Sequence, residues 1–171
     1  PTQSLLDLYT ILDEQGRVDG LTIALVGDLK HGRTVHSLAD LLANFQVDFR
    51  LVAPDALRMP EKIVERLRGR GRPVLETDDL TETVPETDVI YMTRIQRERF
   101  DDPSAYDRLK GSFVLTRDSL VPAKESITVM HPLPRVNEIA TDVDALSGAA
   151  YFRQAANGIP VRMALLTLLA G

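Results

Sequence analysis

The chain of 171 residues contains no cysteine, so it can form neither a disulfide nor a thiolate metal site, and no thiol can act as a nucleophile. It also lacks a long apolar segment. The most hydrophobic stretch, VRMALLTLLAG at residues 161–171, is too short and too interrupted to span a bilayer. No basic n-region followed by an apolar h-region opens the chain. We therefore expect a cytoplasmic protein without a membrane partner.

Positive charge is also scarce, with 20 basic residues against 25 acidic ones and a net charge of −5. Nucleic-acid surfaces carry a basic excess, so we expect no nucleic-acid partner. The remaining composition, 44% hydrophobic and 26% charged, is typical of a globular protein, and the length suits about one domain.

Short apolar runs alternate with amphipathic helical patterns along the chain. An apolar run without polar alternation, such as LTIALVG, is typical of a strand buried on both faces of a parallel sheet. Strands alternating with helices indicate βαβ units, so we predict a doubly wound, Rossmann-like α/β fold with helices on both faces of an open parallel sheet. The sheet should have about five strands, at residues 21–27, 47–53, 73–77, 88–93 and 126–131.

Helical patterns flank these strands, and the last helix is predicted at residues 160–170. The first pattern, at residues 1–15, starts with the chain itself. We interpret this start as a cut in a longer protein, with simple processing of a terminus as the alternative. The apolar stripe of this first helix consists of Leu5, Leu6, Leu8, Tyr9 and Leu12.

Polar, mostly cationic residues follow three of the predicted strands. Arg33 follows the first strand, Arg94 the fourth, and the segment HPLPR the last. Ligands of open α/β sheets bind beyond the carboxyl ends of the strands, and arginine matches carboxylates and phosphates. A helix that starts just after Arg33 would add N–H groups and a positive dipole end. A single such arginine is usually solvated or ion-paired, but the whole set predicts an anionic ligand.

The segment GDLKHGRT, residues 27–34, has the glycine spacing of an NTPase phosphate-binding loop, but Arg33 stands in place of the lysine. Its interior has no further glycine, and no other predicted strand ends in an acidic residue that could hold Mg²⁺. A dinucleotide-binding G-x-G-x-x-G is absent as well. An NTPase is therefore disfavoured, and we expect no cofactor. A metal site is also not expected, because the three histidines, His31, His36 and His131, lack metal-ligand spacing.

In HPLPR the two prolines remove backbone donors and leave carbonyl oxygens as acceptors in a rigid turn. Such a turn could hold an NH₂ group of a ligand, or it could simply stiffen a loop. For His131 three roles stay open: general base, metal ligand or structural histidine. The polar segment 96–110, interrupted by Pro103, is predicted to be a long mobile loop.

At these same residues the sequence resembles the aspartate carbamoyltransferase family. The resemblance implies transfer of a carbamoyl group from carbamoyl phosphate to the amino group of L-aspartate, giving N-carbamoyl-L-aspartate and phosphate in pyrimidine biosynthesis. The matching segments, in family order, are PTQSLLDLYTI, VGDLKHGRTVHSL, VIYMTRIQRERF, HPLPRVNEI and YFRQAANGIPVRMALL.

The resemblance also implies which residues bind the substrates. Arg33 would hold one carboxylate of aspartate, and Arg94 the side-chain carboxylate with help from Gln96, while the loop 96–110 would close over the substrates. Gln3 would contact the carbamoyl group. The carbonyl turn at Leu133 and Pro134, with a cis peptide bond between them, would hold the carbamoyl NH₂.

The family's chain has two halves, and residues 1–171 resemble only the aspartate-binding one. The carbamoyl-phosphate-binding half is absent from this chain, and the family's catalytic histidine would directly precede Pro1, so we expect this piece alone to be inactive. The family forms catalytic homotrimers, and some members bind regulatory chains. Asn137 departs from the aspartate expected there, beyond the direct ligands.

Two alternatives remain. Ornithine carbamoyltransferase has cysteines in both proline motifs, where this chain has Thr2 and Pro132, and its cationic substrate gives no reason for two arginines. A non-catalytic module that binds dicarboxylates would not need Gln3 and Leu133.

Overall fold

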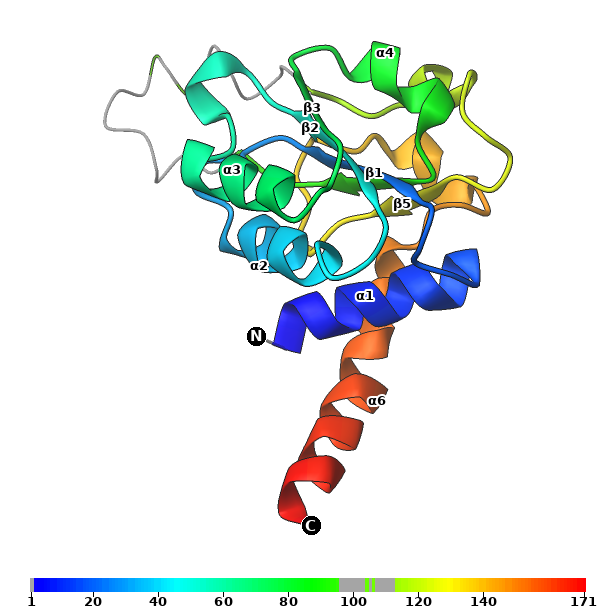
Figure 1. Ribbon diagram of the computed structural model, residues 1–171. Coiled ribbons are helices and arrows are strands. Elements are labelled where there is room, and N and C mark those ends of the chain that lie inside the picture. The colour runs from blue at the N-terminus through cyan, green and yellow to red at the C-terminus, as the bar shows by residue number, and fades with distance from the viewer. Residues whose placement is uncertain (1, 96–103, 105, 107–112) are drawn as a thin grey trace.

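The computed structural model describes residues 2–95, 104, 106 and 113–171. In these residues five parallel strands form one sheet in the order β3-β2-β1-β4-β5 (Figure 1). Each of the five predicted runs contains one strand, so the predicted open parallel sheet is confirmed. The strands are β1 (Thr22–Val26), β2 (Asp48–Val52), β3 (Val74–Thr77), β4 (Val89–Met92) and β5 (Thr128–Met130).

The middle of the sheet is where its topology reverses. From β1 the chain winds outward through β2 and β3, and it then returns to β4, which pairs with the other side of β1. Leu25 of β1 consequently lies opposite Leu51 on one side and Tyr91 on the other. Such a switch point leaves a crevice beyond the carboxyl ends of the two central strands. The residues that follow β1 and β4 therefore face the predicted ligand site.

Helices and short helical turns cover both faces of the sheet, as predicted (Figure 1). α2 (Arg33–Leu42) and α3 (Glu61–Gly69) pack on one face, together with part of α1 (Thr2–Gln15). α4 (Leu80–Thr83) and several 3₁₀ turns pack on the other. Side chains of β1 alternate between the two cores, with Ile23 in the first and Ala24 in the second.

α1 buries a different face from the one its apolar stripe suggests. Leu6 and Ile11 are buried, but Leu5, Tyr9 and Leu12 are exposed. The rest of the buried face is polar and consists of Ser4, Asp7 and Thr10. Burial of polar groups costs free energy unless they find hydrogen-bond partners, so this face must meet polar groups elsewhere in the fold.

The last helix, α6, spans Tyr151–Ala170 and not residues 160–170, so the predicted start was wrong. The predicted start coincides with Pro160, a residue type that usually breaks the interior of a helix. Inside the helix Pro160 removes only one backbone donor, and burial of Tyr151 and Gln154 holds the preceding turns against the sheet and α1. Packing therefore overrides the local preference.

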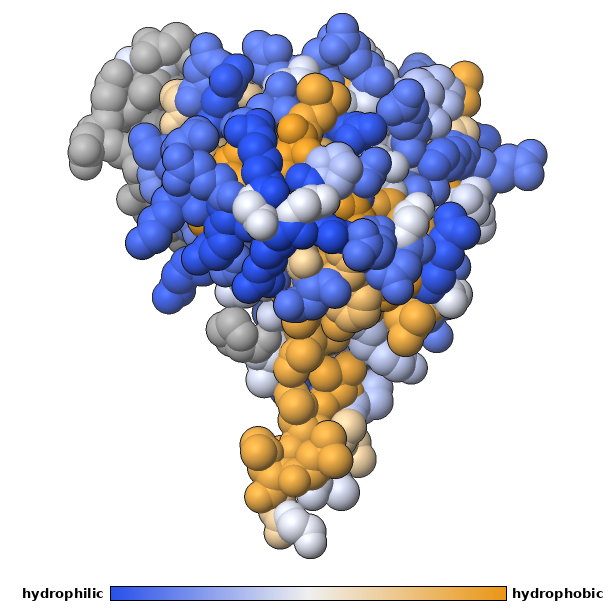
Figure 2. Space-filling model, in the orientation of Figure 1, coloured by the Kyte–Doolittle hydropathy of each residue, from blue (hydrophilic) through white to orange (hydrophobic). Residues whose placement is uncertain are grey.

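The carboxyl-terminal part of α6 projects from the body of the domain and carries an apolar surface (Figures 1 and 2). A groove between α1 and α6 continues this surface and includes Leu5, Leu165 and Leu166. Across the described residues, no helix combines the length and the apolarity needed to cross a membrane. The exposed apolar side chains of α6 beyond residue 158 are Ile159, Met163, Leu166, Leu168 and Leu169.

Candidate functional site

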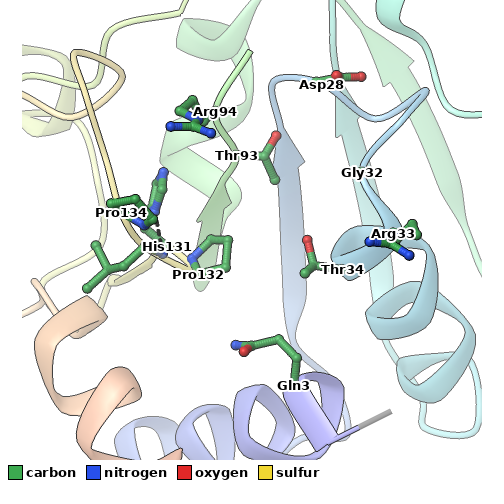
Figure 3. A pocket seen from close by; sticks show the side chains of 11 residues that line it. Gln3, Asp28, Gly32, Arg33, Thr34, Thr93, Arg94, His131, Pro132 and Pro134 are labelled. Atoms are coloured by element: carbon green, nitrogen blue, oxygen red, sulfur yellow. Dashed lines mark hydrogen bonds between the residues drawn. The ribbon is translucent and has the colours of Figure 1, made fainter. Parts of the chain in front are cut away.

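A pocket of about 260 Å³ opens at the carboxyl ends of β1, β4 and β5 (Figure 3). The structure brings five of the six predicted binding residues into it: Gln3, Arg33, Arg94, Leu133 and Pro134. The sixth, Gln96, lies outside the described residues, as does the predicted loop 96–110 apart from residues 104 and 106. The remaining lining residues are Asp28, Gly32, Thr34, Thr93, His131 and Pro132.

The two arginines reach the pocket from different elements. Arg33 is the first residue of α2, and Arg94 follows β4 after Thr93. Gly32 is the N-cap of α2 and supplies no side-chain hydrogen bond to the first turn. The first N–H groups of α2 therefore point out of the helix end without a side-chain cap, which suits an anion beside Arg33. Two guanidinium groups and a helix N-terminus at one pocket have the chemistry that matches anionic groups such as carboxylates.

Asp28 lines the same pocket but is used to fold the loop after β1. Its buried carboxylate accepts a 2.9 Å hydrogen bond from the backbone N–H of His31, and Nδ1 of His31 lies 3.1 Å from the same oxygen. Asp28 therefore shapes the turn that leads into α2. That Asp28, Thr34 and Thr93 line the pocket was not predicted from the sequence. The available signal was their position in the chain: Asp28 directly follows the first strand run, and Thr34 and Thr93 are neighbours of the predicted Arg33 and Arg94.

β1 and β4 end in close contact, which depends on a glycine. Gly27 has φ +112°, and a Cβ built on it would lie 2.5 Å from the carbonyl oxygen of Thr93. Thr93 in turn donates both its N–H, at 2.8 Å, and its hydroxyl, at 2.9 Å, to the carbonyl of Val26. These contacts fix the backbone from which Arg94 enters the pocket.

The turn at Leu133 and Pro134 has the cis peptide bond that the family resemblance implied, and Leu133 has φ +47°. His131 holds this turn with both ring nitrogens. Nδ1 accepts the N–H of Leu133 at 2.8 Å, so the proton of a neutral ring sits on Nε2, which donates to Glu138 at 2.8 Å. Of the three roles left open for His131, the structure supports the structural one.

The carboxylate of Glu138 holds the far side of His131 and the residues that follow the turn. One carboxylate oxygen accepts from His131, and the other accepts the backbone N–H groups of Val136 and Asn137 at 3.1 and 3.0 Å. Burial alone would raise the pKa of Glu138, but the hydrogen bonds from His131 and from backbone N–H groups outweigh it and lower the pKa below 4.5. The ionised carboxylate is therefore the form that supports the turn.

This gives a pH-dependent prediction for Glu138→Gln. Because the folded-state pKa is depressed, the stability from this carboxylate is present above the ordinary value of 4.5 and is lost as the pH falls through the lower folded-state pKa. We expect Glu138→Gln to cost about 1–3 kcal/mol at pH 7 and clearly less near pH 3, measured by urea unfolding. Glu86→Gln, whose carboxylate is exposed beside Arg50, is the control and should cost little at either pH. An equal cost of Glu138→Gln at both pH values would contradict this role.

Arg135 belongs to another cluster, although it follows the same strand. Its guanidinium makes two 2.5 Å contacts with the carboxylate of Asp144 and stands 3.1 Å from the hydroxyl of Tyr151. It does not line the pocket. Among the residues that the structure describes, no three His, Asp or Glu side chains gather in a group that could hold a metal ion.

Comparisons with known proteins agree with this geometry. The family model described as aspartate/ornithine carbamoyltransferase, Asp/Orn binding domain, matches residues 19–169. The aspartate carbamoyltransferase catalytic subunit of Thermococcus onnurineus is 58% identical over all 171 residues, which cover 55% of that protein. The multifunctional protein CAD of Squalus acanthias is 54% identical over the whole chain, which covers 8% of that protein.

Solved structures show the same fold. The catalytic subunit of M. jannaschii aspartate transcarbamoylase is 51% identical with a TM-score of 0.92, over 99% of this chain and 56% of that one. Aspartate transcarbamoylase of Trypanosoma cruzi, in complex with carbamoyl phosphate and aspartate, is 47% identical with a TM-score of 0.91, over 97% of this chain and 55% of that one. The chain thus spans about half the length of the single-function relatives it matches.

Proposed function

Because this chain belongs to the aspartate/ornithine carbamoyltransferase family through its aspartate/ornithine-binding domain, we propose that it supplies the aspartate-binding half of an aspartate carbamoyltransferase active site. The observation that carries the proposal is the pocket itself, in which Arg33 and Arg94 share one cavity with Gln3 and the Leu133–Pro134 turn. The arginines suit the two carboxylates of aspartate, and an amide and backbone carbonyls suit a carbamoyl NH₂.

In the proposed reaction the α-amino nitrogen of aspartate attacks the carbamoyl carbon of carbamoyl phosphate. A C–N bond forms, the C–O bond to phosphate breaks, and the amine proton leaves with the phosphate group. An amine needs no protein nucleophile, so the work of this half of the site is to place the amine and to hold the carbamoyl group still. Arg33 and Arg94 place the aspartate, while Gln3 and the carbonyls at Leu133 and Pro134 orient the carbamoyl NH₂.

Aspartate fits this pocket better than ornithine does. The side chain of ornithine is cationic and would approach Arg94, and the carboxylate that lines the pocket, Asp28, is already bonded to His31. The relatives from Thermococcus onnurineus, M. jannaschii and Trypanosoma cruzi, which are aspartate enzymes by name, support the same choice. A dicarboxylate-binding module without catalysis would explain the arginines but not the polar groups on the carbamoyl side.

We also propose that a second, carbamoyl-phosphate-binding domain completes the site. Two facts support this: the chain matches only 55% of the length of its Thermococcus relative, and α6 exposes an apolar face next to the groove with α1. A catalytic homotrimer, with regulatory chains in some members, is the assembly that the family resemblance implies. Carbamoyl phosphate and L-aspartate are its substrates.

The test uses a fusion protein in which this chain replaces the matching segment of the Thermococcus onnurineus subunit. We expect the fusion protein to form N-carbamoyl-aspartate from carbamoyl phosphate and aspartate, and the 171-residue chain alone to be at least about a thousandfold slower, because positioning of the second substrate is lost. Product formation can be followed directly with both proteins at equal concentration. Rapid turnover by the chain alone would contradict the half-site. A fusion protein that binds aspartate without turnover would favour the binding module.

A further inference from the structure

Behind the pocket, the buried polar face of α1 meets a network centred on Asp7. This carboxylate is fully buried and accepts three hydrogen bonds. Oδ1 accepts from Nε2 of Gln3 at 2.8 Å and from Nε2 of Gln154 at 2.7 Å, and Oδ2 accepts from the hydroxyl of Tyr91 at 2.9 Å. The three donors come from α1, α6 and β4, so Asp7 joins elements that are distant in the sequence.

A carboxylate that only accepts hydrogen bonds fixes the orientation of each amide it meets. Because one N–H of Nε2 of Gln3 is bonded to Asp7, the amide has a fixed orientation, and Oε1 is the acceptor that Gln3 can offer to a ligand. Gln3 rises from α1 towards the pocket (Figure 3). The same carboxylate oxygen orients Gln154, whose Oε1 accepts the backbone N–H of His131 at 2.8 Å. His131 in turn holds the N–H of Leu133.

We propose that Asp7 is a positioning residue that aligns the carbamoyl side of the pocket at two points, directly through the amide of Gln3 and through Gln154 at the start of the 131–134 turn. The effect of Asp7 on catalysis rests on the proposed function, but the hydrogen bonds that align Gln3 and Gln154 are present in this chain whatever its function. The ligand group in question is a primary carbamoyl NH₂, which needs acceptors: Oε1 of Gln3 and the backbone carbonyls of the turn.

The ionised carboxylate is the form that accepts all three hydrogen bonds at once. A protonated Asp7 would donate one hydrogen bond, so a partner would have to accept instead of donate: the Tyr91 hydroxyl if Oδ2 carries the proton, or an amide if Oδ1 carries it. Burial raises the pKa of Asp7 to about 6, although the hydrogen bonds from Gln154, Gln3 and Tyr91 oppose the rise. Burial also raises the pKa of Tyr91, helped by the charge of Asp7, and a hydrogen bond with Thr34 of α2 opposes that rise. Tyr91 therefore stays a neutral donor, and the carboxyl of Asp7 is the group that titrates.

The first experiment records the side-chain amide NMR signals of Gln3 and Gln154 in the 15N-labelled chain between pH 4.5 and 8. Both pairs of signals should shift together with a common midpoint near pH 6. In Asp7→Asn both should lose this titration, and in Asp13→Asn, an exposed carboxylate on the same helix, both should keep it. Signals that titrate independently of each other, or that are unchanged by Asp7→Asn, would overturn the proposal. The wild-type titration decides the point even if Asp7→Asn does not fold.

The second experiment measures steady-state kinetics of the fusion protein. Asp7→Asn should lower kcat/KM for carbamoyl phosphate about tenfold at pH 8 while changing the KM for aspartate by less than about twofold, since only the carbamoyl side is misaligned. The difference from wild type should shrink below pH 6. An equal loss at every pH, or a loss confined to aspartate, would contradict the positioning role. A wild-type fusion protein without activity would instead count against the proposed function, and the NMR result would stand on its own.

Discussion

Arg94→Lys in the fusion protein is expected to lower kcat/KM for aspartate by roughly two orders of magnitude, with carbamoyl phosphate use much less affected. Arginine offers a planar fork that bonds both oxygens of a carboxylate, and lysine offers one point charge. The backbone cannot shift to compensate, because β4 is buried along its whole length and Thr93 is tied to Val26 by two hydrogen bonds. Aspartate saturation curves at fixed, saturating carbamoyl phosphate measure the effect.

The control for this change is Arg58→Lys. Arg58 is half-exposed and pairs with Asp55, away from the pocket, so the same substitution should leave both kinetic constants within about twofold. If aspartate saturation were unchanged in Arg94→Lys, Arg94 would have no part in binding the substrate carboxylate. If both variants lost activity equally, the effect would come from folding.

The largest expected effect on stability comes from Gly27→Ala. The new Cβ would lie 2.5 Å from the backbone oxygen of Thr93 and 2.6 Å from its hydroxyl, at a backbone φ of +112° that side chains rarely adopt. Conformational strain costs about 1–3 kcal/mol and forced overpacking about the same again, so we expect a loss of about 3–5 kcal/mol in the free energy of unfolding. Urea unfolding of the chain measures it, with unchanged m-values as evidence of an intact transition.

Two other glycines separate these causes. Gly20 has φ +77° but open space around it, so Gly20→Ala should show the conformational strain alone, about 1 kcal/mol. Gly69, at the end of α3, has neither a positive φ nor an atom within 4 Å of an added Cβ. Gly69→Ala should therefore leave the free energy of unfolding unchanged or raise it slightly. A Gly27→Ala protein as stable as Gly20→Ala would show that β1 and β4 can separate at their ends without cost, and that the position of Arg94 is not fixed there.

Much of the site could be predicted because it sits at predictable places in the chain. Parallel strands end at one edge of the sheet, so the residues after the runs at 21–27, 88–93 and 126–131 had to meet once the fold class was known. Motif resemblance then suggested roles for Gln3, Arg33 and Arg94, and the pocket brings these three together. The start of α6 was missed because Pro160 breaks most helices, and only packing shows that this one continues.

By itself, the sequence determined the parallel α/β fold, the edge of the sheet that carries the pocket, and the two arginines that line it. Local hydrophobic patterns and strand-end residues are sufficient for these, since each depends on neighbours along the chain. Only the tertiary structure decided which groups surround Asp7 and His131. The hydrogen-bond partners of Asp7 are distant in the sequence: Tyr91 is 84 residues away and Gln154 is 147 residues away. The hydrogen bonds of His131 with Leu133 and Glu138 likewise appear only in the folded chain. The sequence pattern of a helix does not show whether a polar residue faces solvent or a buried hydrogen-bond network. Its partners come from distant parts of the chain, and only the fold brings them together.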